Sequence, residues 1–400
     1  MVKDAKAARV WPKVGFETLP WSTRGDEVAS RRALRAARGD YQAAVPPLIA
    51  DRPVILSPDV LTLADDASRE LTRFDSEAGL VAVPFASILL RTESASSSEV
   101  ENLTSSAKQV ALAEIGASAS GNAQLVVANV RAMQAAIVLS DRLDESAIIE
   151  THEALLSDSK PAVVGRWRDE QVWIGGGSIS PHSASFVPPH HDRVQRLMTD
   201  LISFTERTDV PALAQAAIAH AQFETIHPFP DGNGRTGRAI IQAMLRGSGV
   251  TRNATVPVSA GLLHDLDAYF GALDAYRAGV PEAIVAAVAE AAFAAINNGR
   301  RLAGDIRAAS DRWDSVIAVR SDSSVHRLKE FLLSQPVVNV KTVAAALAVS
   351  EIAAAASITR LEEFGVLTRA SGGDRNRLWQ ASEVLDALDA FAARARRARA

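Results

Sequence analysis

Residues 226–240, IHPFPDGNGRTGRAI, place a histidine, an acid, three glycines and two arginines within a short stretch. His227 titrates near neutral pH, so its side chain is suited to act as a general base. Asp231 offers a carboxylate that can hold a Mg²⁺ ion bridging phosphate oxygens. The combination predicts nucleotide phosphate chemistry in which a histidine deprotonates an attacking hydroxyl.

The glycines and arginines of the same stretch favour an anion. Gly232 and Gly234 lack side chains, so their backbone N–H groups can approach a ligand closely. N–H groups at the start of a helix favour phosphate. Arg235 and Arg238 are three residues apart and share one helix face in the first turn, where the helix dipole disfavours cations. Two arginines at this place therefore indicate a negatively charged ligand between them.

Each of these features has a simpler explanation when it is taken alone. A glycine-rich turn before a helix is usually only a turn, and a histidine after a helix is usually structural. His220 is expected to satisfy a hydrogen bond in the core. A histidine metal site that uses His220 or the adjacent pair His190 and His191 is the weaker alternative, because no i, i+4 pair with a nearby acid is present. The conjunction at fixed spacing is more specific than any single feature.

Helices are expected to position this stretch. Residues 212–224 have a helical pattern, and Pro228 and Pro230 prevent the helix from continuing. A new helix is expected to start near Gly234. Upstream, Ser57 is suited to cap a helix that starts at Pro58, and its apolar positions follow helical spacing. Those apolar positions are Leu61, Ala64, Leu71 and Phe74.

Three segments differ from this helical pattern. The first, up to about Pro53, is rich in Pro and Trp, and predicts extended chain and short helices. The second, VVGRWRDEQVWIGGGSIS, alternates and ends in three glycines, so it predicts a short β-hairpin or flap. Its residues Val172 and Trp173 could pair with an extended target segment by strand addition, although a plain surface hairpin would look the same. The third segment is the C-terminal part of the chain.

The composition excludes several classes. The chain has 400 residues, 48% hydrophobic and 22% charged, which allows two or three globular domains. A net charge of −4 gives no general attraction to nucleic acid or to anionic membrane. There is no cysteine, so disulfides and Cys-ligated zinc are excluded. No apolar signal is present at the N-terminus, and no apolar run reaches the ~18 residues of a membrane span. We expect a cytoplasmic protein without membrane contact.

The stretch HPFPDGNGRTGR resembles the signature of the Fic (filamentation induced by cAMP) family, His-Pro-Phe-x-(Asp/Glu)-Gly-Asn-Gly-Arg-x-x-Arg, at every fixed position. The segment GRWRDEQVWIGG is similar to the target-binding flap of that family. The segments FVPPHHDRVQRLMTDL and PVSAGLLHDLDAYFGALDAYRAG resemble the regions before and after the motif. The resemblance implies a mainly α fold, with a Fic helical-bundle core, a short β-hairpin flap and a C-terminal winged-helix domain.

The resemblance also implies an activity, the transfer of AMP from ATP to a Ser, Thr or Tyr hydroxyl of a target protein. His227 would be the base, and Asp231 would bind Mg²⁺ or Mn²⁺. Phe229 would be buried and would hold the loop. The nucleotide would contact the following residues: Gly232, Asn233 and Gly234 as the anion hole, Arg235 and Arg238 at the phosphates, and Tyr269 at the adenine. A tyrosine at helical spacing such as Tyr269 is, however, more often a core residue.

A second motif resembles the inhibitory motif of the family, (Ser/Thr)-x-x-x-Glu-(Gly/Asn). Ser97 is followed by Glu101 and Asn102. A bidentate pair of Glu101 with Arg238 would remove that arginine from the γ-phosphate and leave ATP in an unproductive pose. An alternative explanation is a capping box of Ser98 and Glu101 at the start of a helix.

The C-terminal region predicts three short helices and a hairpin with Gly372 and Gly373 at its tip, which is the outline of a winged helix. Residues 321–400 carry 11 Lys and Arg against 9 Asp and Glu, and four of those arginines follow Phe391. The helix expected to contact DNA bases contains Arg360, several alanines and three acidic residues. This composition is poorly suited to hydrogen bonding with base edges. A module that docks a protein or forms a homodimer is as well supported as one that binds DNA.

We therefore expect an N-terminal helical region over 1–115 with an inhibitory helix at about 97–110, a catalytic core over 116–305, and a winged helix with a basic tail over 306–400. The expected function is ATP-dependent protein adenylyltransfer, on other proteins or on the chain itself, with inhibition by Glu101. Two alternatives remain open. The same site could remove AMP from a target, or the chain could be a DNA-bound regulator that senses nucleotide.

Overall fold

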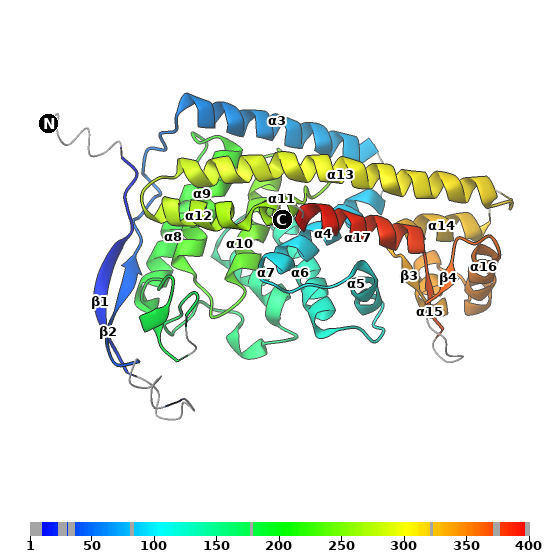
Figure 1. Cartoon of the computed structure of the whole chain (residues 1–400), viewed down its shortest axis with the longest axis horizontal. Coiled ribbons are helices and arrows are strands. Elements are labelled where there is room, and N and C mark those ends of the chain that lie inside the picture. The colour runs from blue at the N-terminus through cyan, green and yellow to red at the C-terminus, as the bar shows by residue number, and fades with distance from the viewer. Residues whose placement is uncertain are drawn as a thin grey trace. The chain divides into compact units, whose positions relative to one another are not determined.

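The computed structural model describes residues 10–22, 30, 37–80, 84–176, 179–320, 323–370 and 377–396. Helices dominate the described chain (Figure 1), as the sequence predicts. By its contacts the chain divides into two compact units, of which one contains residues 1–68, 134–248 and 267–289 and the other contains the rest. Of the five passages of the chain between the units, three lie inside long helices. These are α3 (Pro58–Leu80), α6 (Gly121–Val138) and α13 (Glu282–Val316).

The first unit carries the histidine and glycine motif. Its elements include β1 (Gly15–Trp21), β2 (Gly39–Val45), α7 (Glu145–Leu156), η1 (Pro161–Val163), η2 (Pro181–Ser183), η3 (His191–Arg193), α8 (Val194–Thr205), α9 (Ala212–Ile226), α10 (Asn233–Gly247) and α12 (Leu266–Arg277). Every α9 residue after Ala212 is buried, so this helix is the centre of the unit. It packs so closely on α10 that a side chain at position 237, which is a glycine, would have no room next to Phe223 and Glu224.

The second unit carries the motif around Glu101 and the C-terminal region. Its elements include α4 (Pro84–Val100), α5 (Ala107–Glu114), α11 (Val258–His264), α14 (Ser324–Ser334), β3 (Val337–Val338), α15 (Val340–Leu347), α16 (Glu351–Glu363), β4 (Thr368–Arg369), β5 (Trp379–Gln380) and α17 (Ser382–Arg396). Helix α4 packs on α11 and is fixed by the buried Glu93. The two carboxylate oxygens of Glu93 accept hydrogen bonds from the Ser259 backbone N–H at 2.9 Å and the Ser259 hydroxyl at 2.7 Å.

The helix expected from Pro58 is confirmed as α3, with Ala64, Leu71 and Phe74 buried as their spacing predicts. Leu61 differs, since its side chain is 38% exposed. The extended chain expected for the N-terminal segment is confirmed, and no short helix lies among the residues of this segment that the structure describes. The described part forms the antiparallel pair β1–β2, in which Phe16 lies opposite Ala44. The alternating pattern of β1 is weak in the sequence because prolines and tryptophans interrupt it.

Of the hairpin or flap predicted for VVGRWRDEQVWIGGGSIS, the described residues show one antiparallel bridge, between Ile174 and Phe186. The Ile174 N–H donates to the Phe186 carbonyl at 2.9 Å, and the Ser185 N–H donates to the Ile174 carbonyl at 2.8 Å. Gly177, the last of the three glycines, lies outside the described residues. The described residues therefore form one short bridge in place of the expected two-stranded hairpin.

The C-terminal region contains the three helices that the sequence predicts, and a small antiparallel sheet in the order β3-β5-β4. Strand β3 lies between the first two of these helices and was not expected. The hairpin tip with Gly372 and Gly373 lies outside the described residues, as do the last two arginines of the tail. This order of elements fits the predicted winged helix, which stays a prediction.

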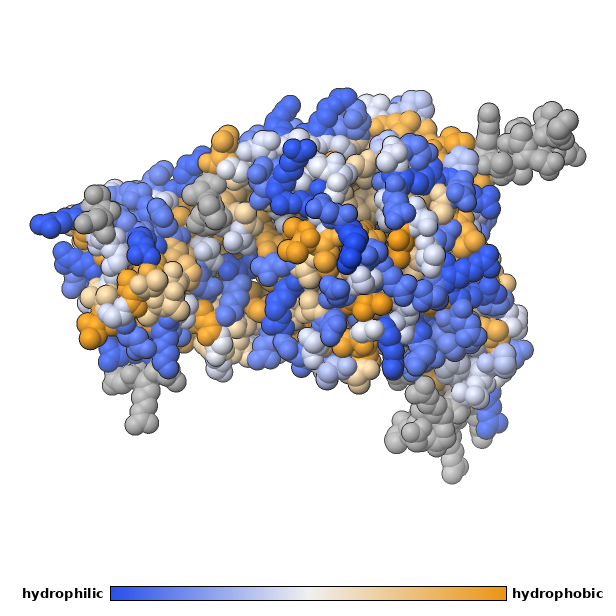
Figure 2. Space-filling model, turned by 180° about the vertical axis from the view of Figure 1, so that it is seen from behind, coloured by the Kyte–Doolittle hydropathy of each residue, from blue (hydrophilic) through white to orange (hydrophobic). Residues whose placement is uncertain are grey.

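Hydrophobic residues are scattered between hydrophilic ones on the face shown in Figure 2, as on most protein surfaces. No single helix among the described residues is long and apolar enough to cross a membrane. Only the sharply bent pair α15 and α16 passes that test when the two helices are taken together.

Candidate functional site

His227 is the residue at which helix α9 ends. Its backbone adopts the left-handed conformation, with φ of 51° and ψ of 61°, and its N–H donates to the Phe223 carbonyl at 2.8 Å. This conformation is uncommon for a residue with a side chain, and Pro228 prevents the helix from continuing. The His227 side chain is 19% exposed, and its Nδ1 lies 3.9 Å from a carboxylate oxygen of Glu224. The helix end therefore presents a mostly buried imidazole with limited access to solvent.

The His227 imidazole is neutral at physiological pH. Burial lowers its pKa to about 3, and the nearby positive charges of Arg168 and Arg277 act in the same direction. The hydrogen bond at Glu224 and the charge of Asp231 oppose this shift and are weaker. The pKa of His227 therefore lies well below the near-neutral value expected from the sequence. The neutral imidazole still has a lone pair available to accept a proton, which is the form that a general base requires.

The loop after His227 is held by reciprocal hydrogen bonds between Phe229 and Asn233. The Phe229 N–H donates to Asn233 Oδ1 at 2.9 Å, and Asn233 Nδ2 donates to the Phe229 carbonyl at 2.8 Å. The Phe229 ring is buried, as predicted, and stacks on His152 with 3.6 Å between the ring centroids. It also packs against Trp167 and Phe223. The loop is therefore rigid, and the Asn233 amide is engaged with the backbone.

Asp231 lies in this loop with its side chain 37% exposed. Its carboxylate accepts hydrogen bonds from the Lys160 ammonium and, at 2.6 Å, from the Gly232 N–H. The Asp231 backbone carbonyl lies 3.0 Å from His152 Nε2. Burial would raise the pKa of Asp231, but the hydrogen bonds and the Lys160 charge outweigh it and hold the pKa below its usual value. Asp231 is therefore ionised, and its carboxylate is paired with the Lys160 ammonium.

Helix α10 begins directly after this loop. Gly232 is left-handed with φ of 76°, and the helix starts at Asn233. A Cβ at Gly232 would lie 3.0 Å from a methyl group of Leu155, so the position has neither the conformation nor the space for a side chain. Arg235 and Arg238 are almost fully buried in the first turns of the helix. Arg235 Nη2 lies 3.9 Å from Asp231 Oδ1.

This arrangement can bind phosphate next to a base. The helix start offers backbone N–H groups and a positive dipole end, while Arg235 and Arg238 add two buried cations. Asp231 fits a Mg²⁺ ion that takes one protein carboxylate and fills its other positions with water and phosphate oxygens. The structure thus brings His227, Asp231, Gly232, Asn233 and the two arginines together in one unit.

Two charged residues of the site were missed by the sequence reasoning. Lys160 pairs with Asp231, and Arg168, only 3% exposed, donates to the His227 carbonyl at 2.8 Å. The positions of Lys160 and Arg168 in the sequence do not indicate that either residue contacts this loop. The one available signal was the position of Arg168 within GRWRDE, inside the predicted flap.

The structure places the predicted flap residues beside the N-terminal hairpin. The Trp173 ring packs edge-on against Trp21 with 5.5 Å between the ring centroids. Both Val172 and Trp173 are half-buried. Tyr269 is 2% exposed, and its hydroxyl lies 2.7 Å from His220 Nε2. The expected core hydrogen bond of His220 is thereby confirmed. Contact of Tyr269 with adenine stays a prediction.

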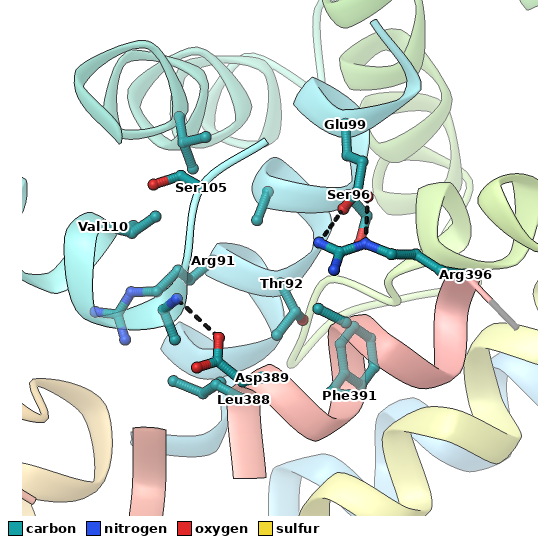
Figure 3. Close-up of a pocket in the computed structure, with 14 residues that line it drawn as sticks. Arg91, Thr92, Ser96, Glu99, Ser105, Val110, Leu388, Asp389, Phe391 and Arg396 are labelled. Carbon is teal, nitrogen blue, oxygen red and sulfur yellow. Dashed lines mark hydrogen bonds and ion pairs between the residues drawn. The ribbon is translucent and has the colours of Figure 1, made fainter. Parts of the chain in front are cut away.

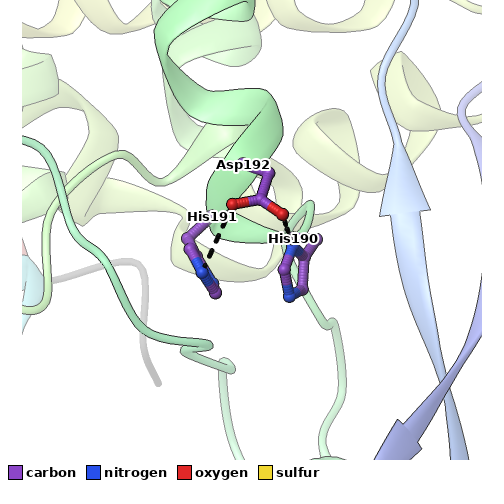
Figure 4. Close-up of side chains that lie close together, drawn as sticks. All are labelled: His190, His191 and Asp192. Carbon is purple, nitrogen blue, oxygen red and sulfur yellow. Dashed lines mark ion pairs between the residues drawn. The ribbon is translucent and has the colours of Figure 1, made fainter.

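His190 and His191 lie with Asp192 at the start of α8 (Figure 4). Nδ1 of His190 and Nε2 of His191 are 3.2 Å and 3.5 Å from the two oxygens of the Asp192 carboxylate. Among the described residues, these three side chains lie close enough together to be possible ligands of one metal ion. Asp192 is 79% exposed, and the two contacts are also those of ordinary surface ion pairs. Surface ion pairs explain the positions of these three residues as well as a metal site does, so the histidine metal site remains the weaker alternative.

The motif of Ser97 and Glu101 lies at the end of a helix in the second unit. Helix α4 ends at Val100, and Asn102 is left-handed with φ of 62°. The Leu103 N–H donates to the Ser98 carbonyl, and the Ser98 hydroxyl donates to the Ser94 carbonyl. These bonds belong to a helix C-terminus. The capping-box explanation was therefore wrong, and the expected inhibitory helix over 97–110 is interrupted between α4 and α5.

Side-chain contacts fasten this end of α4 to the C-terminal helix α17 (Figure 3). Glu99 lies between Ser97 and Glu101 and forms two hydrogen bonds with Arg396. Asp389 of α17 accepts a hydrogen bond of 3.0 Å from the Ala107 N–H at the start of α5. Ser97 is fully buried. Glu101 and Arg238 belong to different units, so their pairing stays a prediction.

Two segments of the chain match known family models. Residues 142–245 match the Fic/DOC family, and residues 61–138 match the N-terminal part of the Fic/DOC family. The first segment contains the whole site from Lys160 to Arg238, and the second contains the motif of Ser97 and Glu101. The resemblance that the sequence indicates is thereby confirmed.

Curated relatives share the first of these regions. The protein adenylyltransferase fic-1 of Caenorhabditis elegans is 31% identical over 109 residues, which cover 27% of this chain and 20% of that protein. A probable protein adenylyltransferase of Aquifex aeolicus is 32% identical over 111 residues, which cover 25% of this chain and 33% of that protein. The matches span between a fifth and a third of these two relatives.

A crystal structure of a Fic family protein from Desulfovibrio desulfuricans is similar over 82% of this chain and 97% of that one, with a TM-score of 0.51 and 21% identity. At this identity the likeness concerns the fold alone. A structure of Fic-1 from C. elegans covers 61% of this chain and 73% of that one, with a TM-score of 0.44.

Proposed function

We propose that this chain, which carries the Fic domain and the Fic N-terminal segment of the Fic/DOC family, is an ATP-dependent protein adenylyltransferase. One observation carries the proposal. A single rigid loop places a neutral His227, an ionised Asp231 and the uncapped start of α10 within one unit. A base beside a phosphate-binding helix start fits the transfer of a nucleotidyl group better than binding alone.

In the proposed reaction a hydroxyl oxygen of the target attacks the α-phosphorus of ATP. The bond from this phosphorus to the oxygen bridging to the β-phosphate breaks, and pyrophosphate leaves with the electron pair. The proton of the hydroxyl passes to the neutral imidazole of His227. Arg235, Arg238 and the N–H groups of α10 offset the negative charge of the phosphates. The product is a target protein with AMP in a phosphodiester bond.

Asp231 would hold a Mg²⁺ or Mn²⁺ ion when the nucleotide is bound, and the ion would offset phosphate charge. The carboxylate is ionised and partly exposed, which fits this role. Phe229 and Asn233 keep the loop in one conformation through their reciprocal bonds. The reaction therefore needs little rearrangement of the loop on the part of this chain.

We extend the proposal to inhibition by Glu101. A carboxylate that forms a bidentate pair with Arg238 would take this arginine away from the γ-phosphate. The helix end that carries Glu101 is held by buried Ser97 and by the Glu99–Arg396 pair, so its backbone has a defined conformation. A defined conformation is what a reversible inhibitory contact requires.

The test uses ATP labelled at either the α- or the γ-phosphate, with the Glu101→Gly protein, Mg²⁺ and a cell lysate. The proposal predicts bands, absent from lysate incubated without the variant, that are labelled from α-labelled ATP and not from γ-labelled ATP. Label from γ-labelled ATP alone would indicate phosphate transfer, and would contradict the proposal. No incorporation from α-labelled ATP, together with loss of AMP from a target protein adenylylated beforehand, would indicate AMP removal instead.

A further inference from the structure

Arg168 is a buried cation whose guanidinium hydrogen bonds all go to backbone carbonyls. Nε donates to the His227 carbonyl at 2.8 Å, and Nη1 donates to the Glu170 carbonyl at 2.8 Å. Nη2 donates to the Pro189 carbonyl at 2.5 Å and to the Ile226 carbonyl at 3.4 Å. The side chain is 3% exposed. Such a residue costs free energy to bury unless its donors are satisfied, and here four carbonyls satisfy them.

These carbonyls belong to three segments that meet at Arg168. Ile226 and His227 form the end of α9, where carbonyls have no partner within the helix. Pro189 belongs to the loop before α8, and Glu170 belongs to the flap segment. The Arg168 N–H also donates to the Pro228 carbonyl at 2.9 Å. One residue therefore contacts three successive residues of the loop that carries the base.

The flap segment is tied to the same point. Gln171 Nε2 donates to the Pro188 carbonyl at 2.9 Å, and Gln171 Oε1 accepts a hydrogen bond of 3.0 Å from the Tyr41 hydroxyl. Val172 and Trp173 follow immediately in the chain. The backbone at residues 168–173 thus links the left-handed turn at His227 to the segment expected to bind the target.

We propose that Arg168 is a positioning residue for His227, which fixes the left-handed turn of the base and couples it to the flap segment. The inference rests on the proposed adenylyltransferase function. Arg168 does not contact the reacting atoms in this scheme. It acts through the His227 and Ile226 carbonyls, and a planar fork of donors is what allows it to hold them together with Pro189 and Glu170.

The Arg168→Lys variant distinguishes the effect of the hydrogen-bond geometry of residue 168 from the effect of its charge. Arg168→Lys keeps a positive charge beside His227 but replaces the fork by a single ammonium group, which cannot reach four carbonyls at these positions. Arg166→Lys is the matched control, because Arg166 lies two residues away and its side chain is 67% exposed. Arg168→Gln serves as a second variant if the lysine protein is poorly folded.

The experiment measures incorporation of AMP from α-labelled ATP into the chain itself and into lysate proteins, with every variant in the Glu101→Gly background. We expect Arg168→Lys to lower the rate at saturating ATP by at least about tenfold. Binding of a non-hydrolysable ATP analogue, measured by calorimetry, should stay within about twofold, since Arg168 does not touch the phosphate site. Arg166→Lys should change neither quantity.

Two outcomes would overturn the positioning role. One is an unchanged rate in Arg168→Lys. The other is a loss of analogue binding and of thermal stability together in both Arg168→Lys and Arg168→Gln, which would make Arg168 a residue of the fold alone. Failure of the Glu101→Gly parent itself to incorporate AMP would be a failure of the proposed function, and is seen before any Arg168 variant is compared.

Discussion

The Lys160 ammonium donates a hydrogen bond to the carboxylate of Asp231, the residue expected to bind the metal. Lys160 is 55% exposed and comes from the short segment before η1, far from residue 231 in the sequence. In the absence of a divalent ion, this ammonium group balances the charge of the carboxylate. A metal ion arriving at Asp231 has to compete with it.

Replacing Lys160 by methionine should therefore strengthen binding of a divalent ion. We expect Lys160→Met to lower the dissociation constant for Mn²⁺ by about threefold, a modest effect because the pair is partly exposed to solvent. Calorimetric titration with Mn²⁺ at pH 7.5 measures the change. Lys160→Arg keeps the cation and should bind Mn²⁺ as the wild type does. Weaker Mn²⁺ binding by Lys160→Met would show that Lys160 assists the ion and does not compete with it.

On the proposed pairing of Glu101 with Arg238, Glu101→Gly should raise the rate of AMP transfer by roughly a hundredfold, since breaking a hydrogen-bonded charge pair costs about 2–5 kcal/mol. Incorporation of α-labelled AMP measures it. Glu99→Gly is the matched control. It places the same glycine near the end of α4, but it removes a carboxylate that pairs with Arg396. An equal rise in both variants would show that loosening of α4, and not loss of the Glu101 carboxylate, activates the chain.

Gly237→Ala should destabilise the first unit, because the new Cβ would lie 2.8 Å from Glu224 Oε1 and 3.0 Å from His220 Nδ1. Overpacking of this kind costs about 1–3 kcal/mol in the free energy of unfolding. Gly271→Ala is the control, since this glycine lies within α12 and no atom lies within 4 Å of its new Cβ. Alanine there should stabilise the helix by about 0.5–1 kcal/mol. Urea unfolding should give opposite signs for the two changes, and equal signs would contradict the packing of α9 on α10.

Acid should destabilise the fold through three buried histidines. Burial lowers the pKa of His152 to about 4 and the pKa values of His220 and His227 to about 3. The unfolded chain binds protons at these groups near pH 6.5, whereas the folded chain does not, so stability falls as the pH drops below 6.5. At pH 5 the loss is about 2 kcal/mol for each histidine.

Urea unfolding midpoints at pH 7.5, 6.0 and 5.0 measure this dependence. His152→Phe keeps a ring against Phe229 and removes one of the three titrations, so its midpoint should fall less with acid. A midpoint that is constant from pH 7.5 to 5.0 would contradict the burial of neutral imidazoles.

The sequence alone predicts the central loop well because the residues of the loop are local to one another. Pro228 and Pro230 end one helix, Gly232 requires a left-handed backbone, and the next helix starts one residue from its predicted position. The roles assigned to His227, Asp231 and Arg238 need only this local geometry. Nothing beyond the stretch itself was required to place these three residues together.

Contacts between distant segments were not predictable in the same way. The partners of Arg168 are backbone carbonyls, which leave no trace in the side-chain sequence. The pair of Lys160 and Asp231 spans 71 positions. The capping-box explanation of Ser98 and Glu101 failed because a short motif does not say which end of a helix it occupies. Extended chain was expected around β1, but its pairing with β2 was not, because the alternation of a half-exposed strand is weak beside Pro20 and Trp21.

The most direct test compares Glu101→Gly with the double variant Glu101→Gly/His227→Ala, both incubated with Mg²⁺, α-labelled ATP and lysate. Loss of the His227 imidazole removes the group that accepts the hydroxyl proton, while the phosphate-binding start of α10 remains. We predict labelled bands with Glu101→Gly and none with the double variant, although both bind a non-hydrolysable ATP analogue. Equal labelling by the two proteins would contradict the assignment of His227 as the base and, with it, the proposed mechanism.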